Sequence, residues 1–383
     1  MSAWRIGPEV VRGEAYRQGI GRILRGIRFT ELEAPDCRLA AQRTAWLSGG
    51  TAVWNHLHDN RSELVINGPA DPRWTPRQRT LLLAVDELYR DRYLSDDTWA
   101  ALDLTPPQRV DLCFLVGVYT AIALLANSFD RDLDQPAEVV PLRAGRTTEH
   151  PRWLLPETPR LPNPGPGEAG AVYRWFSSVI GALNGGGSVD GVAMFGRSPV
   201  TFTTLLPFVA RAGAVRLARD LSELVTLRAT WNAGSQYHRG HHGRAAEFAG
   251  LSPAEIDRVA AGPEDSGWSE DQRLVLCAVD DLQIYRRVGD DTWKRLTVRF
   301  TTWQIHDILV IVANYETLCM ALNSFGIRFE ENAWRGGLLT PLWAALRARG
   351  RRAAHGRGMV SVGRRIDADP ARRRGGIGGH GPG

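Results

Sequence analysis

Hydrophobic positions along the chain recur mostly at helical spacing, and the alternation typical of strands is rare. The stretch SEDQRLVLCAVDDLQIYRR, residues 269–287, opens with a serine suited to an N-cap and with two acidic residues. Its apolar positions then return every three or four residues: Leu274, Cys277, Ala278 and Leu282. A short capped helix over 289–300 and a long apolar helix over 302–325, closed by Gly326, should follow. The pattern predicts an all-α fold of antiparallel neighbouring helices.

Two further helices are expected before this group. Residues 218–231 carry apolar side chains at helical spacing, and the sequence NAG then interrupts the pattern. Ser235 can cap a second helix that runs to Gly250, where Gly-Leu-Ser is a suitable stop.

The chain also repeats itself. Residues 57–102 align with residues 251–296 without a gap at an offset of 194, and the match resumes after two inserted residues at an offset of 196. The identical pairs include Gly68 and Gly262, Trp74 and Trp268, Asp86 and Asp280, and the triplet Asn-Ser-Phe at 127–129 and 323–325. Identity at this density indicates two tandem copies of one helical domain.

Four segments follow from this repeat. We expect a degenerate N-terminal repeat over 1–130, a Pro/Gly-rich linker with a short helix over 131–190, a C-terminal repeat over 191–340 and a disordered tail over 341–383. Eight prolines lie between residues 136 and 166 of the linker. The net charge of +5 misleads, because ten arginines and two aspartates after residue 346 give the tail +8 and leave −3 for the rest. That balance does not favour specific nucleic-acid binding.

The composition favours a soluble protein of the cytoplasm. We expect no apolar run long enough to span a bilayer and no secretory signal at the start. None of the four cysteines forms a C-x-x-C pair, and Cys113, Cys277 and Cys319 lie in apolar runs where cysteine acts as a small buried hydrophobe.

The candidate chemistry lies in the turn WNAGSQYHRGHH, residues 231–242. Three of the nine histidines in the chain fall within five positions there. His238 and His242 are four residues apart, on one face of the expected helix, and Glu223 lies on the helix before it.

This arrangement resembles the carboxymuconolactone decarboxylase and alkyl hydroperoxidase D superfamily. The resemblance covers residues 191–330 well and 20–130 more weakly. In the peroxidase branch a glutamate is followed at fixed spacing by two cysteines and a histidine, and the same spacing here gives Glu223, Ser235, His238 and His242. The tyrosine between the two cysteines corresponds to Tyr237, and GLSPAEIDRVAAG, residues 250–262, supports the match.

The two redox cysteines are absent, replaced by Ser235 and His238, so thiol peroxidase chemistry is excluded. The decarboxylase branch also lacks the cysteines and keeps a tyrosine and a histidine. The resemblance therefore implies a cofactor-free acid/base enzyme, of the decarboxylase, lactone isomerase, hydrolase or cyclase type, acting on a small carboxylic acid, lactone or polyketide-like substrate. We assign His242 as general acid/base and Glu223 as the group that orients it or relays its proton. Tyr237 and His238 are assigned as groups that polarise a carbonyl or stabilise an enolate. Ser235 and Tyr315 are assigned to substrate binding.

At the repeat offset of 194, Tyr237, His238 and His242 correspond to Arg43, Thr44 and Ser48, so the first copy is expected to be a structural partner. Glu31 is the candidate counterpart of Glu223 there. A non-catalytic scaffold or binding protein and a metalloenzyme using His238, His242 and Glu223 remain as alternatives. We expect no cofactor, no membrane and no specific nucleic-acid partner, and homo-oligomers are possible.

Overall fold

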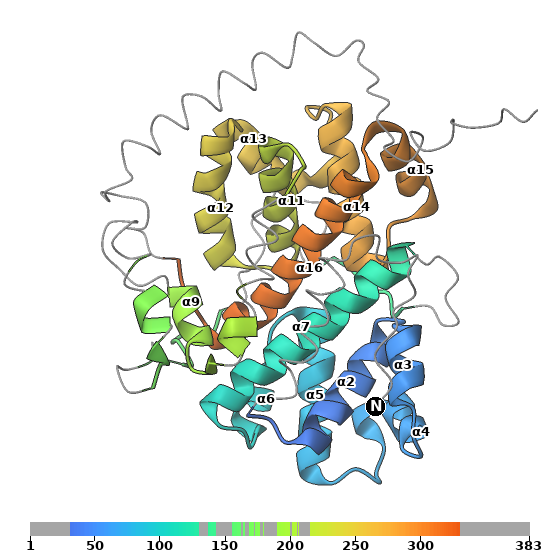
Figure 1. Cartoon of the computed structure of the whole chain (residues 1–383), viewed down its shortest axis with the longest axis vertical. Coiled ribbons are helices and arrows are strands. Elements are labelled where there is room, and N and C mark those ends of the chain that lie inside the picture. Colours follow the sequence, from blue (N-terminus) through green and yellow to red (C-terminus); the bar gives the residue numbers. More distant parts are fainter. Residues whose placement is uncertain are drawn as a thin grey trace, which may run out of the picture.

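The computed structural model describes residues 31–129, the N-terminal half, and 215–329, the C-terminal half, together with 137–142, 155–161 and parts of 164–206 (Figure 1). Every regular element in these ranges is a helix, so the all-α prediction is confirmed. The N-terminal half contains α2 (Ala34–Leu47), α3 (Thr51–Leu57), α4 (Ser62–Asn67), η1 (Gly68–Ala70), α5 (Pro76–Asp91), α6 (Asp96–Ala101) and α7 (Pro106–Phe129). After α9 (Asp190–Phe195), the C-terminal half contains α11 (Arg219–Asn232), α12 (Gln236–Ala249), α13 (Pro253–Arg258), η2 (Val259–Glu264), α14 (Glu270–Tyr285), α15 (Asp290–Arg299) and α16 (Thr302–Phe325). The predicted tail, 341–383, lies outside the described residues.

Most of the predicted helix ends are confirmed. Ser269 forms a capping box with Gln272 at the start of α14. Gly250 and Gly326 adopt left-handed conformations that end α12 and α16. Ser235 stands at the N-cap of α12 as expected, but its side chain makes no capping hydrogen bond there. That hydroxyl is used by the candidate site instead.

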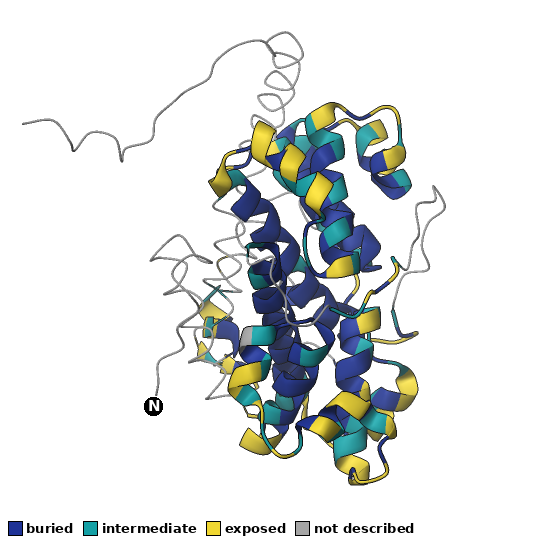
Figure 2. Cartoon of the chain, turned by 90° about the vertical axis from the view of Figure 1, so that its right-hand side faces the viewer, coloured by how far each residue is buried: buried dark blue, intermediate teal, exposed yellow. Residues whose placement is uncertain are grey.

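The core is built on α7 and α16, each 24 residues long, which pack against each other at the centre of the molecule (Figures 1 and 2). They meet closely at Gly117, where an added Cβ would lie 2.7 Å from the Cα of Thr317. A glycine is required there because any side chain would push the two helices apart.

The same two helices overturn one sequence expectation. Both are long and apolar enough to cross a bilayer, so the expectation that no such run exists is wrong by length and composition. In the structure, 89% of the most apolar stretch of α7 and 94% of that of α16 are buried inside the protein. The apolar residues of α7 and α16 therefore serve as core, and length alone is weak support for a membrane span.

A buried ion pair occurs at the same place in each half. Arg43 of α2 donates to both carboxylate oxygens of Asp86 at 2.7 and 2.8 Å, and Arg228 of α11 donates to Asp280 at 2.7 and 2.9 Å. All four residues are buried. The pairing fixes α2 on α5 and α11 on α14 with the same geometry.

These arginines correct the expected alignment of the first helices. Arg43 matches Arg228, which is an offset of 185 rather than 194, so α2 matches α11 and the seven-residue α3 matches the 14-residue α12. The expected correspondence of Tyr237, His238 and His242 with Arg43, Thr44 and Ser48 is therefore wrong. The offset changes between α3 and α4, where the first half is shorter than the second.

Glu31 is not the counterpart of Glu223. The backbone N–H of Glu31 donates to Asp111 of α7 at 2.6 Å, as the N–H groups of Arg216 and Leu217 donate to Asp307 of α16. Residue 31 therefore matches residue 216. At the offset of 185, the position of Glu223 is taken by Arg38, which pairs with Asp59.

The two halves exchange contacts through the repeated Asn-Ser-Phe triplet. The hydroxyl of Ser324 accepts from the N–H of Leu94 at 3.0 Å, and that of Ser128 accepts from Val288 at 3.3 Å. Each half thus satisfies a buried backbone donor of the other, and the two halves form one body.

The described parts of the linker contact both halves. The N–H of Glu138 donates to Leu47 at 2.8 Å, and that of Val140 donates to Ile284 at 3.0 Å. Further along, the N–H of Arg160 donates to Phe325 at 2.9 Å. The linker helix expected from the sequence corresponds in part to residues 173–176, which are helical.

Candidate functional site

His242 is held from both sides by hydrogen bonds. Its Nδ1 lies 2.8 Å from Oε2 of Glu223 on α11, and its Nε2 lies 2.8 Å from the hydroxyl of Tyr315 on α16. The side chains of His242 and Glu223 are 21% and 12% exposed, so this chain of three groups lies at the edge of the buried interior. A carboxylate accepts hydrogen bonds, so Nδ1 is the nitrogen that donates to Glu223. In the neutral ring, Nε2 then accepts from the hydroxyl of Tyr315.

Tyr315 keeps its phenolic proton at neutral pH. Burial, followed by the charge of Glu223, raises the pKa of its hydroxyl above the usual value. The hydroxyl is therefore present as a hydrogen-bond donor that can pass on a proton, and not as a phenolate.

A second cluster lies deeper in the same region. Nδ1 of His238 is 2.9 Å from the hydroxyl of Ser235 and 3.5 Å from Sγ of Cys319. All three residues are buried. Burial, followed by the charges of His242 and His241, lowers the pKa of His238 well below its usual value, so this ring is neutral. Its ring meets that of Tyr315 edge-on at 5.4 Å between centroids, which joins the two clusters.

Tyr237 is placed differently from the expectation. Its hydroxyl accepts from the N–H of Gly191 on α9 at 3.3 Å, and an added Cβ at Gly191 would lie 2.8 Å from the tyrosine ring. The ring lies 4.5 Å from that of His241 and 5.4 Å from that of His238. Tyr237 therefore packs α12 against α9, with its hydroxyl on Gly191.

The structure thus brings the six residues chosen from the sequence into one region. Glu223, His242 and Tyr315 form one cluster, and Ser235 and His238 form the other. The ring of Tyr237 packs edge-on against His238, but its hydroxyl faces Gly191 instead of the two clusters. Cys319 was assigned to packing, and its contact with His238 was missed. The signal was present, because Cys319 follows Tyr315 by one helical turn and shares its face of α16. No group of three or more potential metal ligands gathers among the described residues.

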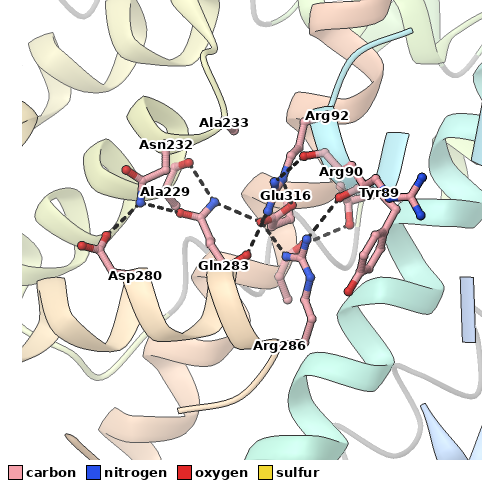
Figure 3. Close-up of polar contacts among 12 residues, drawn as sticks. Tyr89, Arg90, Arg92, Ala229, Asn232, Ala233, Asp280, Gln283, Arg286 and Glu316 are labelled. Carbon is pink, nitrogen blue, oxygen red and sulfur yellow. Dashed lines mark hydrogen bonds and ion pairs between the residues drawn. The ribbon is translucent and has the colours of Figure 1, made fainter. Parts of the chain in front are cut away.

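A third cluster, of buried charges, lies on the neighbouring face of α16 (Figure 3). Glu316 accepts from Arg92 of the N-terminal half at 2.9 and 3.0 Å, and from Arg286 and Gln283 of the C-terminal half at 3.0 Å each. Arg92 is 6% exposed, and Arg286 and Glu316 are fully buried. Burial alone would raise the pKa of Glu316, but Arg92 and Arg286 outweigh burial and hold it at about 2.

Comparison with known proteins does not identify a relative: no family model, no curated protein and no solved structure matches the chain.

Proposed function

We propose that this protein is a cofactor-free acid/base enzyme with one working site, in the C-terminal half. We further propose that it consists of two tandem copies of a domain similar to those of the carboxymuconolactone decarboxylase and alkyl hydroperoxidase D superfamily. The observation that carries the enzymatic proposal is the hydrogen-bonded chain Glu223–His242–Tyr315, with 2.8 Å at each link.

The tandem arrangement is supported by contacts that recur in both halves. Besides the two arginine–aspartate pairs, the indole N–H of Trp74 donates to the carbonyl of Gly68 at 3.0 Å, and that of Trp268 donates to Gly262 at 2.9 Å. Both glycines have positive φ, 75° and 77°. These special backbone positions would be hard to reach independently, which favours duplication.

The chain of three groups can pass a proton in either direction. With His242 neutral, Tyr315 donates to Nε2, and the phenolic oxygen can accept a proton or hydrogen bond from a substrate. With His242 protonated, Nε2–H donates to the phenolic oxygen, and the hydroxyl hydrogen turns to the substrate. Glu223 favours the ring orientation in both states and stabilises the charged one.

Such a relay suits reactions in which a proton moves next to a carbonyl. Decarboxylation of a β-keto or vinylogous acid leaves an enolate that must gain a proton at carbon, and lactone isomerisation moves one proton between two carbons. We therefore propose a lyase or isomerase reaction on a small carboxylic acid or lactone.

The test is whether the purified full chain turns over any member of a panel of β-keto acids and unsaturated lactones. Turnover is measured as carbon dioxide release for the acids and as a change in ultraviolet absorbance for the lactones. His242→Gln should lower kcat/KM by about 10²- to 10⁴-fold, the usual contribution of a general acid/base. His58→Gln makes the same kind of change in the N-terminal half and should leave the rate unchanged. Equal turnover by the wild type and His242→Gln would end the proposal.

A further inference from the structure

The two faces of one helix link the candidate site to the N-terminal half. Tyr315 and Glu316 are consecutive on α16: the first reaches His242, and the second lies in the buried charge cluster. A rotation or shift of α16 displaces both side chains together, because they are attached to consecutive residues of one helix.

The N-terminal half holds α16 through the turn that follows α5. Arg92 binds both oxygens of Glu316, and its own carbonyl accepts from Asn323 at 3.2 Å. Two residues later, the N–H of Leu94 donates to Ser324 at 3.0 Å. Asn323 also donates to Ala233 at 2.8 Å, in the turn that leads into α12. The N-terminal half thus contacts α16 at Glu316, Asn323 and Ser324. Through Asn323 these contacts extend to the turn before α12, the helix that carries the histidines.

The matching position in the N-terminal half lacks the carboxylate. At the offset of 196, Glu316 corresponds to Thr120 of α7, whose buried hydroxyl oxygen has no hydrogen-bond partner among the described residues. Arg92 and Arg286 share the same left-handed backbone conformation, with φ of 53° and 56°, yet both converge on the helix that carries Tyr315. The charge cluster is therefore built on α16, the helix that also carries Tyr315 of the proposed site, while Thr120 replaces the carboxylate on α7.

We propose that Arg92 is a positioning residue for the C-terminal site: together with Arg286 it holds Glu316 and so fixes the orientation of α16 that places the Tyr315 hydroxyl on Nε2 of His242. This inference rests on the proposed function for its catalytic meaning, but the positioning itself is testable without a substrate.

The hydrogen bond is sensitive to small movements of the helix. It measures 2.8 Å, and a separation beyond about 3.5 Å no longer counts as a hydrogen bond. A tyrosine hydroxyl stands roughly 9 Å from the helix axis, so a rotation of about 5° is enough to break the contact.

Arg92→Met is the informative variant. The cluster holds two arginines and one glutamate, so removing Arg92 leaves the Arg286–Glu316 pair with balanced charge, and we expect the protein to fold. Arg92→Lys, which keeps the charge but not the two parallel hydrogen bonds, is the second variant. Arg43→Met is the matched control. It removes a buried arginine of the N-terminal half that does not contact Glu316, and it leaves the Arg90–Asp86 pair with balanced charge, as Arg92→Met leaves Arg286–Glu316.

The readout is the nitrogen NMR signal of Nε2 of His242 in histidine-labelled full-length protein. Tyr315→Phe defines the signal of a ring that has lost its tyrosine donor. Arg92→Met should move the wild-type signal toward that position, Arg92→Lys should move it less, and Arg43→Met should leave it in place. With a turned-over substrate, kcat should fall by about 10- to 100-fold in Arg92→Met, as for a misplaced catalytic group.

An unmoved Nε2 signal in Arg92→Met would overturn the proposal. An equal movement in Arg43→Met would also overturn it, because general loosening of the fold would then explain the effect. Should no substrate be turned over at all, the proposed function fails, while the NMR comparison still decides whether Arg92 positions Tyr315.

Discussion

Replacing Glu316 by glutamine should destabilise the protein strongly, and the loss should depend on pH in a defined way. The carboxylate is fully buried between Arg92 and Arg286, and its pKa is held at about 2 instead of the ordinary 4.5. A difference of this size corresponds to about 3 kcal/mol of stability at neutral pH. Leaving a buried charge without its partner costs roughly 3–5 kcal/mol in other proteins. This range is consistent with the value of about 3 kcal/mol obtained from the pKa of Glu316.

The sign of the pH dependence follows from the lowered pKa. The ionised carboxylate stabilises the folded state fully above pH 4.5, and this contribution is lost as the pH falls toward 2. The glutamine variant lacks the contribution at every pH. The difference in unfolding free energy between wild type and variant should therefore narrow below pH 4.5, by at most about 1.4 kcal/mol per pH unit.

Urea unfolding followed by tryptophan fluorescence, from pH 7 down to pH 3.5, measures this difference. Arg92→Met serves as the companion variant, because it leaves one balanced pair and should lose less stability than Glu316→Gln. A loss of less than about 1 kcal/mol in Glu316→Gln at pH 7, or a difference that stays constant with pH, would refute the reasoning.

Three further outcomes are expected. Gly262→Ala should lower the unfolding free energy by about 1–3 kcal/mol, because the residue has φ of 77° and its new Cβ would lie 2.7 Å from Nη2 of Arg228. Urea unfolding checks this. The control is Gly243→Ala, because the new Cβ of this α12 residue would meet only the end of an arginine side chain. The ring of His238 should stay neutral well below pH 6.5, because burial and the neighbouring histidines lower its pKa; NMR titration near pH 6.5 would contradict the buried placement. Since folding keeps that ring from protonating, His238 should also reduce stability increasingly as the pH falls below 6.5, and His238→Gln should weaken this dependence.

The helical fold was predictable because its signals are local. Apolar spacing, Ser269 as a cap and the terminal glycines at 250 and 326 each depend on a few neighbouring residues, and the structure follows them. The alignment of the first two helices was not predictable in the same way. It depends on the contact of Arg43 with Asp86, 43 positions away. The matching spacing of the later helices in the two halves gives no sign that α3 is shorter than α12.

The candidate site was predictable where one helix carries it. The i and i+4 spacing of His238 and His242 places both on one face of α12, and Glu223 lies on the adjoining helix. The role of Tyr315 as donor to His242, the contact of Cys319 with His238 and the grip of Arg92 on Glu316 depend on how α16 crosses the rest of the fold. Sequence spacing cannot supply these distances. The hydroxyl of Tyr237 faces Gly191 for the same reason, because a segment 46 positions away decides where it packs.

The most direct test of the central claim is proton exchange at carbon. The full chain would be incubated in deuterated water with small β-keto acids and unsaturated lactones, and deuterium at the carbon next to the carbonyl would be measured by mass spectrometry. If His242 is the general acid/base, the wild type should incorporate deuterium into at least one compound, and His242→Gln should slow this by about 10²- to 10⁴-fold. Incorporation at the same rate in both proteins, or at the uncatalysed rate in the wild type, would contradict the account.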